Sequence, residues 1–267
     1  ADNNTAIGYL AMAANTTAGD NVAVGMNAML TNTTGNNNTA VGKDALKTNA
    51  TTNNNTAVGN SALFTNVGNE NTGLGGTSMY SNTTGSYNTA VGRSSMRDNT
   101  TASSNTAVGH NAMLLNTTGT RNLAIGANAY DASDTENDNI AIGYDAMTTN
   151  TAGGSANVAI GNYALDALTS GDHNVGVGYD ALTEINTGSN NVGIGNYACD
   201  AVTSGARNTG VGYQALSAVT TTNDNTALGY QAGLAITGAG NVAIGNLALK
   251  AAFGNNDCVA IGSSALT

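Results

Sequence analysis

The chain has 267 residues, of which 9% are charged, and a formal net charge of −10. Its seven Lys and Arg residues cannot form the clustered basic surface that phosphate binding requires, which excludes nucleic acid as an expected partner. No apolar run reaches the roughly 18 residues of a membrane span, so we expect no membrane insertion.

A glycine preceded by Val, Ile or Leu recurs from one end of the chain to the other. Twelve of the 15 intervals between these glycines are 17 residues, and the others are 16, 16 and 18. A register this constant predicts a stack in which each repeat is one coil. We predict an all-β fold, an elongated β-solenoid (β-roll) of about 16 coils of 17 residues that forms a single repeat domain over 1–267. The 16 marker glycines are Gly8, Gly25, Gly42, Gly59, Gly75, Gly92, Gly109, Gly126, Gly143, Gly161, Gly178, Gly195, Gly212, Gly229, Gly245 and Gly262.

Each marker glycine, taken as position 0, follows a short alternating segment. Position −1 is always Val, Ile or Leu, and position −3 is Thr or an aliphatic residue. This period of two predicts a strand with positions −3 and −1 facing a core. Among the residues predicted to stack in that core are Val41, Val58, Leu74, Ile142, Ile160, Val177 and Ile194.

Position −2 between them is Ala in 12 coils and Gly in four, and holds nothing larger. A solvent-facing position would accept longer side chains in some copies. We therefore expect close packing there against another chain, in a side-by-side assembly that we predict to be a homotrimer. The residues predicted to make this contact include Ala141, Ala159, Gly176 and Gly193.

Position +4 is large and apolar in most coils and holds six of the seven Met residues. We predict that this side chain, for example Leu165 or Leu182, closes the core from a second strand or a tight bend. The remainder of each coil is an Asn/Thr/Gly connector with the composition of turns.

Position −4 is Asn in 15 of the 16 coils. Stacking one coil on the next predicts an asparagine ladder whose amides bond to one another or to the turns. Its predicted members include Asn38, Asn55, Asn157, Asn174 and Asn191.

Several segments look like chemical motifs. Gly176–Ala181 matches G-x-G-x-x-A, but the next coil begins too soon for the helix that binds a pyrophosphate. The acidic connector 131–138 lacks the glycine of a twelve-residue calcium loop, and His110 and His173 lie four coils apart. Cys199 at position +4 is expected to be a small core residue. We expect no catalytic residue, metal or cofactor, and no enzymatic activity.

The unit Asn-Thr-Ala-Val-Gly-x-x-Ala-Leu, as at Asn38–Leu46, resembles two groups of repeats. One is the head repeat of trimeric autotransporter adhesins, to which Val22–Gly25 and Val242–Gly245 are similar, and the other is the repeat of bacteriophage tail fibres. The resemblance implies a β-solenoid with three chains side by side. The adhesin unit is typically shorter than 17 residues, and no chaperone domain or membrane anchor is visible here.

We therefore expect a non-catalytic extracellular structural fibre or attachment rod, located as a secreted, cell-surface or virion-surface protein. Its expected partners are further copies of itself and a cell-surface receptor or glycan. One alternative is a filament subunit that polymerises end to end, because neither end of the sequence has an obvious polar cap. Another is an ice-binding solenoid with rows of Thr, although Thr occupies position −3 in only eight coils and is expected to face inward.

Overall fold

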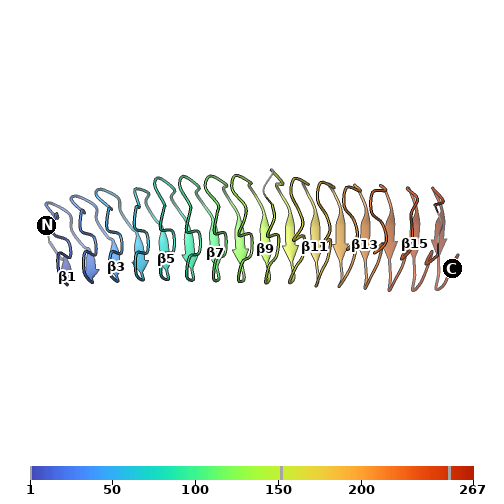
Figure 1. The fold of residues 1–267 in the computed structure, drawn as a ribbon, viewed down its shortest axis with the longest axis horizontal. Coiled ribbons are helices and arrows are strands. Elements are labelled where there is room, and N and C mark those ends of the chain that lie inside the picture. Colours follow the sequence, from blue (N-terminus) through green and yellow to red (C-terminus); the bar gives the residue numbers. More distant parts are fainter. Residues whose placement is uncertain (1, 151–152, 252–253) are drawn as a thin grey trace. The chain divides into compact units, whose positions relative to one another are not determined.

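The computed structural model describes residues 2–150, 153–251 and 254–267. The chain is an all-β parallel β-solenoid with one three-residue strand for each marker glycine, and no helix occurs in these ranges (Figure 1). The strands are β1 Thr5–Ile7, β2 Val22–Val24, β3 Thr39–Val41, β4 Thr56–Val58, β5 Thr72–Leu74, β6 Thr89–Val91, β7 Thr106–Val108, β8 Leu123–Ile125, β9 Ile140–Ile142, β10 Val158–Ile160, β11 Val175–Val177, β12 Val192–Ile194, β13 Thr209–Val211, β14 Thr226–Leu228, β15 Val242–Ile244 and β16 Val259–Ile261.

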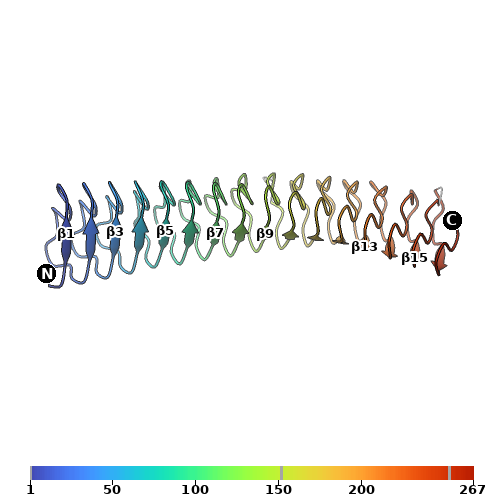
Figure 2. The same ribbon diagram turned by 90° about the horizontal axis from the view of Figure 1, so that it is seen from below.

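Contacts between Cα atoms divide the chain into two compact units, Ala1–Thr135 with β1–β8 and Glu136–Thr267 with β9–β16. Within each unit, consecutive strands pair in parallel and lie side by side in chain order, as Figure 2 shows. The prediction of a single repeat domain over 1–267 stays a prediction.

The pairing places equivalent positions of successive coils directly opposite one another. In the first unit Val41 pairs with Val58, and Val58 with Leu74. In the second unit Ile142 pairs with Ile160, and both Val177 and Ile194 continue that column. The 17-residue spacing therefore corresponds to one turn of the coil.

Hydrogen bonds join successive coils along the bend and the connector as well as along the strands. In the bend, the Leu46 N–H donates to the Ala62 carbonyl at 3.0 Å. In the connector, the Thr33 N–H donates to the Ala50 carbonyl at 2.8 Å. Backbone groups all around the coil are thus satisfied by the neighbouring coil, which is the condition for burying them.

The marker glycine lies where the backbones of two coils approach closely. Gly178 has φ 140°, and a Cβ added to it would lie 2.6 Å from the carbonyl carbon and oxygen of Gly195 in the next coil. L residues rarely adopt such a φ, and no side-chain atom fits at that distance. The positive φ accounts for the glycine at position 0, and the close approach adds a second constraint wherever another coil follows, which is not the case at Gly262.

The segment after the glycine is a tight bend and not a second strand. Positions +2 and +4 both have left-handed backbone, as in Asp180 (φ 52°) and Leu182 (φ 53°). This bend turns the +4 side chain into the coil, where Leu165 and Leu182 are fully buried.

The two faces of each strand are the reverse of the prediction. Ala141 and Ala159 at position −2 are fully buried within their own chain, and Gly176 and Gly193 lie on the same inward face. Position −1 faces outward, and Ile160, for example, retains 38% of its exposed area. The prediction was wrong for the −1 residues as core residues and for the −2 residues as contacts between chains. The outward residues concerned are Val41, Val58, Leu74, Ile142, Ile160, Val177 and Ile194.

The reversal has a steric cause. The bend carries a large +4 side chain across the narrow coil, so only a small residue fits opposite it on the strand. A Cβ on Gly176 would lie 2.2 Å from Cδ1 of Leu165, and a Cβ on Gly193 would lie 3.0 Å from Cγ of Leu182. Position −2 is therefore restricted by the chain's own core, which consists largely of Ala at −2 and +3 and of Leu or Met at +4.

Candidate interaction surface

The outward side chains at positions −3 and −1 form a surface that we call the strand face. All of its residues are Thr, Val, Ile or Leu, and none is charged. Among its residues Val58, Ile125 and Ile194 are 37 to 40% exposed. Soluble proteins rarely leave contiguous aliphatic surface uncovered, so the strand face is the candidate interaction surface of this chain.

The backbone of the strand face is already fully paired within each unit. The Val175 N–H donates to the Asn191 carbonyl at 2.8 Å, and the Gly195 N–H donates to the Val177 carbonyl at 2.7 Å. A partner that covers this face would therefore bury side chains without leaving backbone polar groups unsatisfied.

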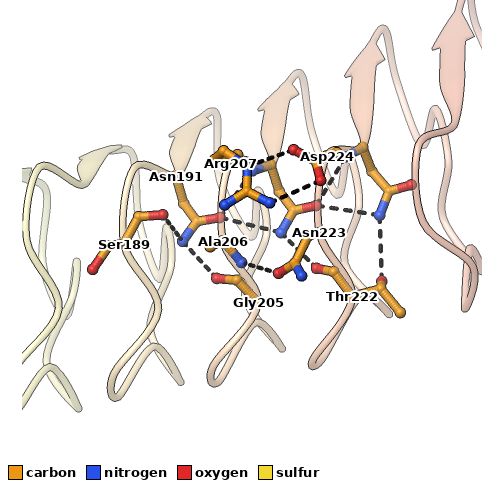
Figure 3. Close-up of polar contacts among 10 residues, drawn as sticks. Ser189, Asn191, Gly205, Ala206, Arg207, Thr222, Asn223 and Asp224 are labelled. Carbon is orange, nitrogen blue, oxygen red and sulfur yellow. Dashed lines mark hydrogen bonds and ion pairs between the residues drawn. The ribbon is translucent and has the colours of Figure 1, made fainter.

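The asparagines at position −4 lie in one buried column beside the strands. The Asn174 backbone N–H donates to Oδ1 of Asn157 at 2.8 Å, and its Nδ2 donates to the Gly188 carbonyl at 2.8 Å. Asn191 repeats both contacts one coil further on, with Asn174 and with Gly205. Figure 3 shows the contact between Asn191 and Gly205. Each amide thus links its own coil to the coil before and to the connector after it.

The first unit contains the same arrangement. Asn55 donates from its backbone N–H to Oδ1 of Asn38 at 2.9 Å and from Nδ2 to the Gly68 carbonyl at 3.0 Å. Asn38 and Asn55 are fully buried, and their amides make the hydrogen bonds that burial requires.

A second buried column, at position +7, was missed by the sequence analysis. In the first unit it holds asparagines such as Asn82 and Asn99, where Nδ2 of Asn99 donates to Oδ1 of Asn82 at 2.5 Å. In the second unit it becomes aliphatic at Leu168, Ile185 and Val202, which are fully buried. The column is hard to recognise in the sequence because its residue type changes from Asn to aliphatic. The spacing of 17 residues between its members would have identified it.

The chain matches no protein-family model and no curated protein. Its site must therefore be interpreted from its own geometry. The described ranges contain no helix with the length and hydropathy of a membrane span. They also contain no group of three or more His, Cys, Asp or Glu side chains placed to hold a metal ion.

The second unit carries a group of carboxylates beside its bends. Burial raises the pKa of Asp200 to about 6, and its Oδ1 is buried with no hydrogen-bond partner among the described residues. Burial also raises the pKa of Asp166, and the nearby charges of Asp180 and Glu184 raise it further. The 2.8 Å hydrogen bond that the Thr183 hydroxyl donates to Asp166 lowers this pKa in part.

A raised carboxyl pKa means that the folded chain binds more protons than the unfolded chain between about pH 4 and pH 6. The free energy of unfolding therefore falls as the pH rises through that interval. Asp200 is only half buried, so solvent screening reduces its effect to about 1 kcal/mol.

Cys199 occupies the +4 position of its coil and is fully buried. Burial raises the pKa of its thiol to about 12. The thiolate, which is the reactive form, is therefore scarce at neutral pH, and Cys199 acts as a small core residue.

Proposed function

We propose that this chain is a non-catalytic structural protein, a fibre or attachment rod of the adhesin or tail-fibre type in which copies pack side by side through the strand face. The observation that carries the proposal is the uncharged, largely aliphatic strand face, whose backbone is paired between neighbouring strands. The stacking contacts of the coils leave this face unused, so it is available to another copy.

A homo-oligomer is the simplest partner for such a face. Identical chains present identical strand spacings, so their aliphatic columns can remain in contact along many coils. Three copies around a common axis would bury the face of each chain, which agrees with the trimer implied by the resemblance. No charged residue lies on the strand face, so the contact places no like charges against one another, and salt at physiological concentration screens the repulsion from the net charge of −10 over about 8 Å.

The test is the mass of the particle in solution, measured by light scattering after size exclusion. We expect the wild-type chain to form a homotrimer. The triple variant Ile160→Lys, Val177→Lys, Ile194→Lys should be a monomer with an unchanged β-type circular dichroism spectrum. Thr187→Lys, on an exposed connector, is the matched control and should remain trimeric. A wild-type chain that stays monomeric, or a triple variant that keeps the wild-type mass, would contradict the proposal.

We propose an extracellular location, as a secreted, cell-surface or virion-surface protein, with a receptor or glycan as the second partner. The supporting observation is a composition rich in Asn, Thr, Ser and Gly with few charged residues. Antibody labelling of intact cells or particles tests the location, and labelling only after lysis would contradict it.

Ice binding is a second candidate because the Thr column faces outward, opposite to the sequence expectation. In the first unit Thr39, Thr56 and Thr72 pair in register and are partly exposed beside an aliphatic column. Thermal hysteresis of the wild-type chain that is lost in Thr72→Lys would support this function, and freezing without hysteresis would exclude it.

A further inference from the structure

Six tyrosines of the second unit lie in successive coils and contact one another in sequence. The distances between neighbouring ring centroids are 5.6, 5.8, 5.5, 5.9 and 5.4 Å. The first four pairs are edge to face and the last is stacked. The rings are Tyr144, Tyr163, Tyr179, Tyr197, Tyr213 and Tyr230.

The first five rings alternate between positions +1 and +2 after the marker glycine, whereas the sixth, Tyr230, lies at +1 as Tyr213 does. In each pair a polar residue occupies the other position. We call this surface the tyrosine checkerboard. Its six rows are Tyr144–Asp145, Asn162–Tyr163, Tyr179–Asp180, Asn196–Tyr197, Tyr213–Gln214 and Tyr230–Gln231.

The solenoid does not need these rings in order to fold. In the first unit the same positions hold pairs such as Lys43–Asp44, Asn60–Ser61 and Arg93–Ser94. The backbone at position +2 is nevertheless the same, with φ 58° at Asp44 and φ 60° at Tyr163. The aromatic column is therefore an addition to the coil and not part of its core.

The four rings at position +1 are exposed, the rings of Tyr163 and Tyr197 at position +2 are partly exposed, and all six are held in place. Tyr144 and Tyr179 retain 44% and 41% of their exposed area, and Tyr230 retains 52%. Each ring packs on its neighbours, and the adjacent asparagines are fixed by the backbone, since the Tyr144 N–H donates to Oδ1 of Asn162 at 2.9 Å. A preordered aromatic surface of this kind loses little side-chain entropy when a ligand binds.

The spacing of the checkerboard suits an extended polymer with a two-unit repeat. Coils follow one another at about 4.8 Å, so the alternation repeats roughly every 9.6 Å. In a β-1,4-linked hexose chain each sugar is turned over relative to the one before it, and each advances the chain by close to one coil spacing. The apolar C–H face of one sugar would then lie on a tyrosine while its hydroxyls reach the adjacent Asn, Asp or Gln.

The charge of the surface favours a neutral polymer. Asp145 and Asp180 would repel an anionic chain, and no Lys or Arg occupies the six rows. A cationic polymer would need carboxylates along the whole surface. The last two rows instead carry the neutral Gln214 and Gln231, which are joined by a 2.8 Å hydrogen bond.

We propose that the tyrosine checkerboard is a binding site for a neutral β-1,4-linked polysaccharide that lies along the stacking direction of the second unit. The site is separate from the strand face, so it can succeed or fail independently of the self-association proposed above.

The experiment is isothermal titration of the full chain with β-1,4-linked hexasaccharides of glucose and of N-acetylglucosamine. The α-1,4-linked glucose hexasaccharide is the control ligand, because it has the same atoms and a helical course. At least one β-linked hexasaccharide should bind at least about tenfold more tightly than the α-linked one, as expected if several rings contribute. No binding of either β-linked ligand, or equal binding of the α-linked one, overturns the proposal.

The variant is Tyr163→Asn, Tyr179→Asn, Tyr197→Asn. Asparagine already occupies position +1 at Asn162 and tolerates the left-handed backbone of position +2, so the fold should be unaffected. Affinity for the β-linked ligand should fall at least about tenfold. Arg93→Asn, at position +1 in the first unit, should bind as the wild type does. An unchanged affinity in the triple variant overturns the proposal. It is also overturned if the triple variant differs from the wild type in oligomeric mass while the wild type binds no glycan, because the rings would then form a contact between copies.

Discussion

Replacement of a marker glycine tests the contact on which the stacking of coils depends. Gly178→Ala would force an L residue to φ 140° and place its Cβ 2.6 Å from the backbone of Gly195. The backbone strain costs about 1–3 kcal/mol, and relieving the clash between two rigid backbones costs about 1–3 kcal/mol more. We expect a loss of about 2–6 kcal/mol, a large part of the stability of a typical domain.

Gly262→Ala separates these two contributions. Gly262 has a similar φ of 125°, but a Cβ there would meet no atom within 4 Å. This variant should lose only the strain, about 1–3 kcal/mol.

The assay is urea unfolding followed by circular dichroism and by tyrosine fluorescence, because a repeat protein need not unfold in a single transition. The second unit should unfold at a clearly lower urea concentration in Gly178→Ala than in Gly262→Ala. A Gly178→Ala midpoint equal to that of the wild type or of Gly262→Ala would refute the proposed close approach of the coils.

Three further predictions concern the second unit. Because the raised pKa of Asp200 destabilises the folded state as the pH rises from about 4 to about 6, the urea midpoint should be higher at pH 5 than at pH 7.5. Asp200→Asn should reduce the accompanying difference in the free energy of unfolding by less than about 1 kcal/mol. Glu184→Gln, at an exposed carboxyl, should reduce it less, and an unchanged pH dependence in Asp200→Asn would contradict the assignment. A maleimide should label Cys258, which is only partly buried, in the folded chain, and should label Cys199 only in urea. If mass spectrometry finds both thiols modified in the folded chain, the core is not closed around Cys199. Asn174→Ala leaves the hydrogen-bonding groups of two neighbouring coils unsatisfied and should lower the free energy of unfolding by roughly 2–4 kcal/mol, measured against Thr187→Ala on the exposed connector.

The sequence determined the stacking of the coils but not which side of the strand faces inward. Constant spacing predicted the pairing of Val41 with Val58, which the structure confirms. Alternation along three residues, however, defines two faces without saying which one is buried. The decisive information was the size of the +4 side chain opposite the strand, because Leu165 leaves no room for more than a small residue at Gly176.

The tyrosines of the checkerboard can be recognised in the sequence, because one lies beside the marker glycine in each of six successive coils. Their contacts cannot, because Tyr144 and Tyr163 occupy different positions relative to that glycine. In the structure their ring centroids lie 5.6 Å apart, because adjacent positions in neighbouring coils are within reach of long side chains. The +7 column was hidden for a related reason, since Asn99 and Val202 share a place in the coil but not a chemistry.

The asparagine ladder has a consequence for how such a chain can change in evolution. Asn174 offers the coil after it the same acceptor that Asn157 offers to Asn174. With respect to the ladder, neighbouring coils are therefore interchangeable, and duplication or loss of the DNA that encodes 17 residues would recreate the asparagine contacts at the new junction. Selection can in this way adjust the number of coils in discrete steps while the chemistry at each junction stays the same.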